Sequence, residues 1–197
     1  MYLVFILATA LVLGMRHATD ADHVIAVSTI ASRERSIWRA SLIGMWWGAG
    51  HMTTILLVGG AIVGFKLVLP PRINAAFELC VALMLIVLGV RGLLTAYQPR
   101  SRIQPVSPFA VGVVHGLAGS AAAALLILPL IPNPAWAVLY LLVFGLGTIG
   151  GMATLTWAIA GSTMYATRRI RGLDRWIIAG AGAISLCFGA FLLYRIA

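Results

Sequence analysis

Apolar residues fill long, nearly unbroken stretches of this sequence, and polar residues gather in short segments between them. Each stretch reaches the length of about 20 residues that a helix needs to cross a bilayer. Within hydrocarbon a chain must satisfy its own backbone hydrogen bonds, so each stretch is expected to be a helix. The six predicted spans cover residues 2–30, 38–65, 73–97, 108–131, 135–164 and 174–196.

The segments between these spans are too short to hold a soluble domain. The pattern therefore predicts an all-α integral membrane protein with one transmembrane domain over residues 1–197. The first and fifth spans are longer than a bilayer core of about 30 Å requires. Their length predicts a tilt, a break or an extension beyond the membrane.

The two halves of the chain resemble each other in sequence. Residues 14–17 match residues 112–115 at an offset of 98, and residues 50–54 match residues 150–154 at an offset of 100. In the third and sixth spans, Gly89 matches Gly189, again at an offset of 100.

Because each half holds three spans, the second half enters the membrane in the opposite sense. The sequence thus predicts two inverted three-helix repeats, about 1–97 and about 108–197. Inverted repeats are typical of transporters with a site between the halves near the bilayer midplane. These offsets predict that His17 overlays His115 and that His51 overlays Gly151.

The composition agrees with this interpretation. Hydrophobic residues make up 61% of the 197 residues and charged residues 10%, against an average of about 25% charged. Such a chain cannot be a soluble enzyme, a disordered tail or a secreted module. The net charge of +9 would suggest nucleic acid in a soluble protein, but here we expect the lipid bilayer as partner and no nucleic acid.

The positive charges predict the orientation, because cytoplasmic loops are enriched in arginine and lysine. With the N-terminus outside, nine basic residues fall on the inner side and three on the outer. We therefore expect a multi-pass protein of the plasma (inner) membrane with both termini outside. The inner set is Arg33, Arg35, Arg39, Arg100, Arg102, Arg168, Arg169, Arg171 and Arg175, and the outer set is Lys66, Arg72 and Arg195.

All four histidines fall inside predicted spans, although ionisable groups are costly there and mark functional sites. They are His17, His23, His51 and His115. A single histidine in a span often satisfies a backbone carbonyl, but four of four, with aspartates beside them, favour a shared function.

The densest polar cluster is residues 16–23. On an ideal helix His17, Asp20 and His23 share a face, whereas Asp22 points about 140° away from His17. A centre that uses His17, Asp22 and His23 therefore requires this segment to bend or unwind. Arg16 lies one turn before Asp20, so an ion pair between them is expected. Asp20 would then be structural and Asp22 a ligand.

Imidazole nitrogens with a carboxylate favour Ni(II), Co(II), Zn(II) or Cu(II) over Mg²⁺ and Ca²⁺, which prefer oxygen ligands. His51 lies near the middle of the second span and is a further candidate ligand. His115 belongs either to the same centre or to a second station nearer the exit.

Two motifs resemble those of the nickel/cobalt transporter (NiCoT) family. The Arg-His-Ala-x-Asp-Ala-Asp-His string at 16–23 is similar to the family signature, and Gly-His-Met-Thr at 50–53 is similar to its second motif. Residues 115–121 and 144–152 resemble the short six-span, urease-accessory (UreH-type) branch. The resemblance implies a permease that imports Ni²⁺, with Co²⁺ as an alternative, and ligands His17, Asp22, His23 and His51.

On this interpretation the protein is not an enzyme, the metal is transported cargo rather than a bound cofactor, and a cytoplasmic metal acceptor is unidentified. Three alternatives stay open. A metal exporter would use the same scaffold. A membrane acyltransferase would use His17 with Asp22, because His-x4-Asp also occurs in that class. A haem-binding subunit would use histidines on facing helices.

Overall fold

The computed structural model describes residues 2–61, 65, 70–98, 106–117, 131 and 133–196. Every regular element within these residues is helical, so the all-α prediction is confirmed. The elements are α1 (Tyr2–His17), α2 (Ala21–Ala31), α3 (Ile37–Thr54), the π-helical turn η1 (Ile55–Gly59), α5 (Pro71–Thr95), α6 (Pro108–His115), α8 (Pro134–Arg169) and α9 (Leu173–Ile196).

Four described helical segments are long and apolar enough to cross a membrane: Ile37–Gly59, Pro71–Thr95, Ala135–Arg169 and Leu173–Ile196. A fifth span arises if α1 and α2, bent by 57° at their junction, are counted together. The predicted span 108–131 is described only in part. Its helix α6 has 8 residues, too few to cross, and residues 118–130 lie outside the described part.

Local sequence sets where several helices begin and end. Pro71, Pro108 and Pro134 each stand in the first turn of a helix, where the missing N–H of proline costs nothing. The Ser107 hydroxyl accepts a hydrogen bond from the backbone N–H of Ala110 and so caps α6. These signals fix the starts of α5, α6 and α8.

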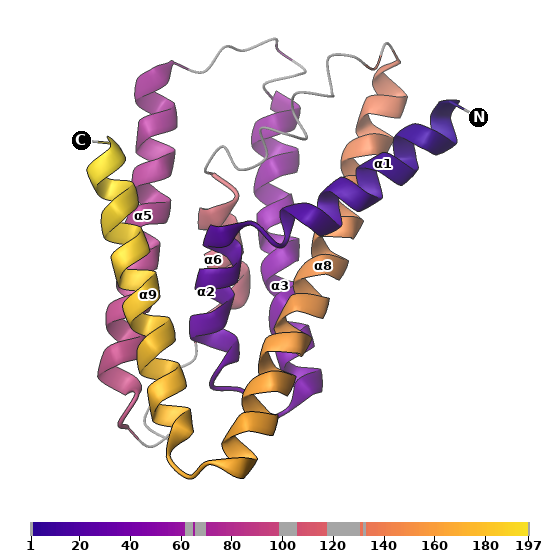
Figure 1. Cartoon of the computed structure of the whole chain (residues 1–197). Coiled ribbons are helices and arrows are strands. Elements are labelled where there is room, and N and C mark those ends of the chain that lie inside the picture. The colour runs from indigo at the N-terminus through magenta and orange to yellow at the C-terminus, as the bar shows by residue number, and fades with distance from the viewer. Residues whose placement is uncertain are drawn as a thin grey trace.

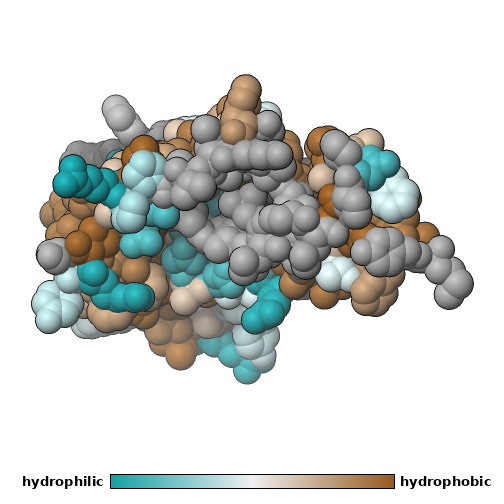
Figure 2. All heavy atoms as spheres, turned by 90° about the horizontal axis from the view of Figure 1, so that it is seen from above, coloured by the Kyte–Doolittle hydropathy of each residue, from teal (hydrophilic) through white to brown (hydrophobic). Residues whose placement is uncertain are grey.

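Both termini lie at the upper end of the molecule in Figure 1, and the α2–α3 connection and the α8–α9 turn lie at the lower end. Gly172 makes that turn with a φ of 80°, which glycine adopts at no steric cost. α8 packs on α1 and α3, α3 also packs on α6, and α5 pairs with α9. Seen from above, hydrophobic side chains extend to the perimeter, as expected for a lipid-facing surface (Figure 2).

The buried apolar side chains form two separate clusters. The upper cluster consists of Ile6, Ala10, Met52, Ile55, Ile131, Ala137, Tyr140, Leu141 and Phe144. The lower cluster consists of Ala18, Ala26, Val27, Ala31, Trp47, Val81, Leu85, Leu88, Val111 and Met152. Along α3, His51 lies between Trp47 of the lower cluster and Met52 of the upper one. A buried polar layer therefore separates two apolar layers.

Helices α3 and α6 cross with their backbones in contact. A Cβ on Gly112 of α6 would collide with the carbonyl oxygen of Trp47 on α3 and would lie 2.9 Å from the backbone nitrogen of His51. Small residues permit this close approach in membranes, where helix association depends on packing. Gly112 thus sets the distance between two helices that carry histidines.

Gly112→Ala is expected to lower the free energy of unfolding by about 1–3 kcal/mol, the usual cost of overpacking. The measurement is thermal unfolding of the purified protein in detergent. Gly150→Ala on α8 is the matched control, since its added Cβ meets no atom within 4 Å. The control should melt at or slightly above the wild-type temperature, because alanine favours helix over glycine. Equal melting temperatures for the two variants would contradict the close crossing.

Candidate metal centre

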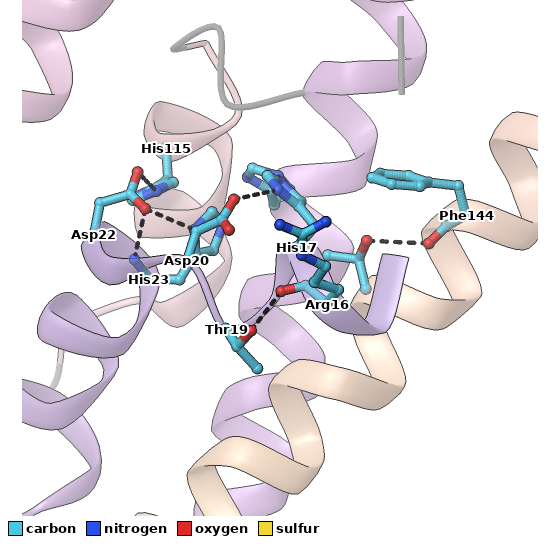
Figure 3. A network of polar contacts seen from close by, with 10 residues as sticks. Arg16, His17, Thr19, Asp20, Asp22, His23, His115 and Phe144 are labelled. Atoms are coloured by element: carbon cyan, nitrogen blue, oxygen red, sulfur yellow. Dashed lines mark hydrogen bonds and ion pairs between the residues drawn. The ribbon is translucent and has the colours of Figure 1, made fainter. Parts of the chain in front are cut away.

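The chain bends where its polar residues are densest. α1 ends at His17 and α2 begins at Ala21, with 57° between their axes. Thr19 closes the end of α1 by donating its backbone N–H and its hydroxyl to the Arg16 carbonyl oxygen, at 2.8 and 2.6 Å (Figure 3). The bend that the positions of His17 and Asp22 required is therefore present.

Three buried histidines from three helices form a first triad: His17 of α1, His23 of α2 and His51 of α3. One ring nitrogen from each lies within 4.8 Å of the others. His17 Nε2 is 3.0 Å from His51 Nε2. Two nitrogens bound at right angles to one ion, each at about 2.1 Å, are separated by about 3 Å. The spacing thus suits two ligands of a single ion.

A second triad consists of Asp22, His23 and His115, whose ligand atoms also lie within 4.8 Å of one another. Asp22 Oδ2 is 3.0 Å from His115 Nε2 on α6. Asp22 Oδ1 is 3.1 Å from His23 Nδ1 and accepts the His23 backbone N–H at 3.0 Å. Figure 3 marks the contacts of the Asp22 carboxylate with His115 and with His23.

His23 belongs to both triads and is fully buried. Its Nδ1 faces Asp22, whereas its Nε2 has no hydrogen-bond partner among the described residues. His51 Nδ1 and His115 Nδ1 are likewise buried, with no partner in the part of the chain that the structure describes. A buried polar atom that makes no hydrogen bond is costly. Ligation of an ion would satisfy atoms of this kind.

Asp20 orients His17 from outside the triads. Its Oδ2 is 2.8 Å from His17 Nδ1, and its side chain is 47% exposed. When neutral His17 donates its Nδ1–H to this carboxylate, the lone pair of Nε2 is directed at the first triad. Carboxylates commonly fix metal-binding histidines in this way.

The predicted ion pair between Arg16 and Asp20 is not formed. Asp20 pairs with His17 instead, and Arg16 is exposed. An i, i+4 pair requires an unbroken helix between the two residues. Here the helix ends at His17, so Asp20 no longer lies one turn above Arg16.

Two aromatic rings lie beside the histidines. The Phe144 ring on α8 lies 5.6 Å from the His17 ring, centroid to centroid. The Trp47 ring on α3 lies 6.3 Å from the His23 ring, and the two are stacked. Neither residue stands out in the sequence, because aromatic residues are common in apolar spans. Phe144 belongs to the upper cluster and Trp47 to the lower one.

The candidate residues are thus regrouped by the structure. His17, His23 and His51 come together as expected, whereas Asp22 groups with His23 and His115. His115, for which the sequence left two roles open, lies against Asp22 in the same cluster. Four imidazoles and a carboxylate form a donor set suited to late divalent transition metals and not to Mg²⁺ or Ca²⁺.

Comparison with known proteins gives two similar sequences. The chain is 34% identical over 212 residues to the Urease accessory protein UreH of Bacillus sp. (strain TB-90). The matched region covers 98% of this chain and 92% of that protein. It is also 32% identical over 77 residues to the High-affinity nickel transport protein of Cupriavidus necator. That matched region covers 37% of this chain and 22% of that protein. No family model matches the chain. No solved structure matches it either.

Proposed function

The chain belongs to the UreH family of urease accessory proteins, and from this premise we propose that it is a permease that imports Ni²⁺ through its buried histidine and aspartate centre. The observation that carries the proposal is the pair of overlapping triads between two apolar layers. The partial similarity to a nickel transport protein supports the same cargo. Co²⁺ is the second candidate, because its donor preferences are close to those of Ni²⁺.

The acyltransferase alternative finds no support in the contacts. Such an enzyme needs its aspartate to orient the catalytic histidine, which would require Asp22 beside His17. Instead, His17 pairs with Asp20, and Asp22 contacts His23 and His115. The names of both relatives also favour accessory or transport roles over catalysis.

We propose that one ion passes between the two triads and that His23 remains a ligand in both. Two divalent ions about 5 Å apart would repel each other by about 13 kcal/mol at an effective dielectric constant of 20. Simultaneous occupancy is therefore disfavoured. His23 presents Nδ1 toward the second triad and leaves Nε2 for the first. The ion would exchange His17 and His51 for Asp22 and His115 while His23 stays close.

Close helix contacts support the inverted repeat. A Cβ at Gly14 would collide with the Phe144 carbonyl oxygen, and a Cβ at Gly112 with the Trp47 carbonyl oxygen. Gly112 follows Gly14 by 98 positions, and Phe144 follows Trp47 by 97 positions. The second contact thus repeats the first with the two halves exchanged. We propose a single domain of two repeats, about 1–97 and 108–197, each with three spans. The span predicted over 108–131 stays a prediction, because residues 118–130 lie outside the described part of the chain.

This correspondence between the halves changes which residue of the second half is expected to overlay His51. Since Trp47 corresponds to Phe144, His51 corresponds to Thr148, three residues before Gly151. Thr148 is fully buried and donates its hydroxyl to the Phe144 carbonyl oxygen. The two halves would then contribute unequal groups at related positions, an imidazole from one and a hydroxyl from the other.

The described arginines support the proposed orientation, with both termini outside the plasma membrane. Seven of them flank the lower connections in Figure 1: Arg33, Arg35, Arg39, Arg168, Arg169, Arg171 and Arg175. Two, Arg72 and Arg195, lie at the upper end. Lys66, Arg100 and Arg102 lie outside the described residues.

A reporter that is active only in the cytoplasm should be active when it is fused within residues 168–171 and silent when it is fused after Ala197. The physical reason is the positive charge retained on the cytoplasmic side. The reverse pattern of reporter activity would contradict the proposed orientation.

The membrane potential supplies enough energy for import. A divalent ion gains about 4.6 kcal/mol on crossing 100 mV, twice the value for one charge. That gain corresponds to an accumulation on the order of a thousandfold. We therefore propose uptake driven by the potential or by an ion gradient.

The decisive experiment measures ⁶³Ni and ⁵⁷Co in proteoliposomes that contain the purified chain, with an imposed potential of either sign. Import predicts nickel accumulation when the interior is negative and little when the potential is reversed. Unloading of preloaded vesicles under the physiological polarity would favour the exporter. Flux equal to that of empty liposomes for both metals would overturn the permease proposal.

A further inference from the structure

A cavity of about 470 Å³ lies at the lower end of the molecule, between the α2–α3 connection and the α8–α9 turn. It is separate from the metal centre, and none of the candidate ligands lines it. Arg35, Arg168 and Arg171 line it together with Asp174 and the polar side chain of Thr167. Three guanidinium groups against one carboxylate make the cavity positively charged.

One of the three arginines is partly neutralised, and the other two are available. Arg35 pairs with Asp174 at 3.8 Å, a long, exposed contact that contributes little stability. Arg168 and Arg171 are exposed and form no ion pair with any residue that the structure describes. A guanidinium group offers paired N–H donors that match the oxygens of a phosphate.

Exposed aromatic side chains mark the depth of this cavity in the membrane. Trp38 stands in the first turn of α3, Tyr165 near the end of α8 and Trp176 in the first turn of α9. All three are more than half exposed. Tryptophan and tyrosine gather at the membrane–water interface, level with the lipid headgroups. The cavity therefore opens at the level where phosphodiester groups are concentrated.

We propose that this cavity binds the phosphate group of an anionic phospholipid through Arg168 and Arg171, with Arg35 at its rim. Basic pockets beside membrane helices on the cytoplasmic side commonly hold such headgroups. The lipid would contact both the α2–α3 connection and the α8–α9 turn, and so would join the two segments at one end of the molecule. The proposal does not depend on which metal the protein carries.

The test is native mass spectrometry of the full chain released from nanodiscs of phosphatidylcholine with added phosphatidylglycerol. The wild type should retain phosphatidylglycerol in preference to phosphatidylcholine. Arg168→Gln with Arg171→Gln should weaken retention by about tenfold or more, because two charge-assisted contacts are lost. Arg72→Gln with Arg195→Gln removes the same charge from the opposite end and should leave retention unchanged.

Two further arms make each outcome decisive. Inorganic phosphate at millimolar concentration should not displace the lipid, and displacement would reassign the cavity to a soluble anion. Arg168→Lys with Arg171→Lys keeps the charge without the paired donors and should give intermediate retention. Equal losses in the lower and upper glutamine pairs would overturn the site in favour of a general effect of net charge. Melting temperatures confirm that each variant is folded.

Discussion

Asp22→Asn is expected to lower nickel uptake at limiting metal by more than tenfold. The substitution keeps the shape of the side chain and one oxygen donor but removes the negative charge that offsets the ion. At an effective dielectric constant of 20, a divalent ion and a carboxylate about 4 Å apart attract each other by about 8 kcal/mol. Even a quarter of that energy exceeds the 1.4 kcal/mol that corresponds to a tenfold change. The assay is initial ⁶³Ni uptake at several metal concentrations.

Two other carboxylate-to-amide substitutions serve as controls for Asp22→Asn. Asp20→Asn should reduce uptake less, because Asp20 acts through His17 and its side chain is 47% exposed, against 20% for Asp22. Glu78→Gln on α5 removes a carboxylate outside the centre and should transport normally. If Asp20→Asn fails while Asp22→Asn transports normally, the roles of the two aspartates are reversed.

His23→Ala is expected to have the largest effect of the four histidine substitutions, with uptake reduced about a hundredfold or more. His23 is the ligand common to both triads, so its loss weakens capture and transfer together. Changes around metal ligands alone cost about 10–100-fold. His17→Ala and His115→Ala each remove a ligand from one triad and should retain more activity.

The measurement pairs uptake with nickel binding in detergent. His115→Ala should bind nickel at the first triad yet transport it slowly, because the receiving triad is incomplete. Thr154→Ala on α8 is the control, since this exposed residue lies outside the motifs and its hydroxyl donates to the carbonyl oxygen of Gly150. Equal losses for His17→Ala, His23→Ala and His115→Ala would falsify the transfer between triads while leaving nickel transport intact.

The sequence predicted the helical class from a strong local constraint, and it required a bend only for a centre that joins His17 with Asp22 and His23. Long apolar stretches must satisfy their own backbone hydrogen bonds, and His17 and Asp22 cannot share one helix face. The sequence did not predict the partner of Asp20, because the helix stops at His17 rather than continuing to Asp20. The expected pairing with Arg16 assumed an unbroken turn.

Other parts of the site depend on contacts between residues far apart in the chain. His115 and Asp22 are 93 positions apart, so spacing alone left the role of His115 undecided. Phe144 and Trp47 look like ordinary core residues until the helices are assembled. The number of spans stays a prediction for a different reason, since residues 118–130 lie outside the described structure.

The glycine contacts also have a mechanical consequence for the centre. Backbones meet closely where α1 crosses α8 and where α3 crosses α6 and α8, so these four helices form one interlocked frame that holds His17, His51 and His115. α2 contains no glycine, packs less extensively and joins α1 through residues 18–20. Spin labels on α2 and α8 should therefore change their separation when nickel is added, and labels on α1 and α8 should not. On this prediction α2 moves Asp22 and His23 relative to His17, His51 and His115, which the four packed helices hold in place.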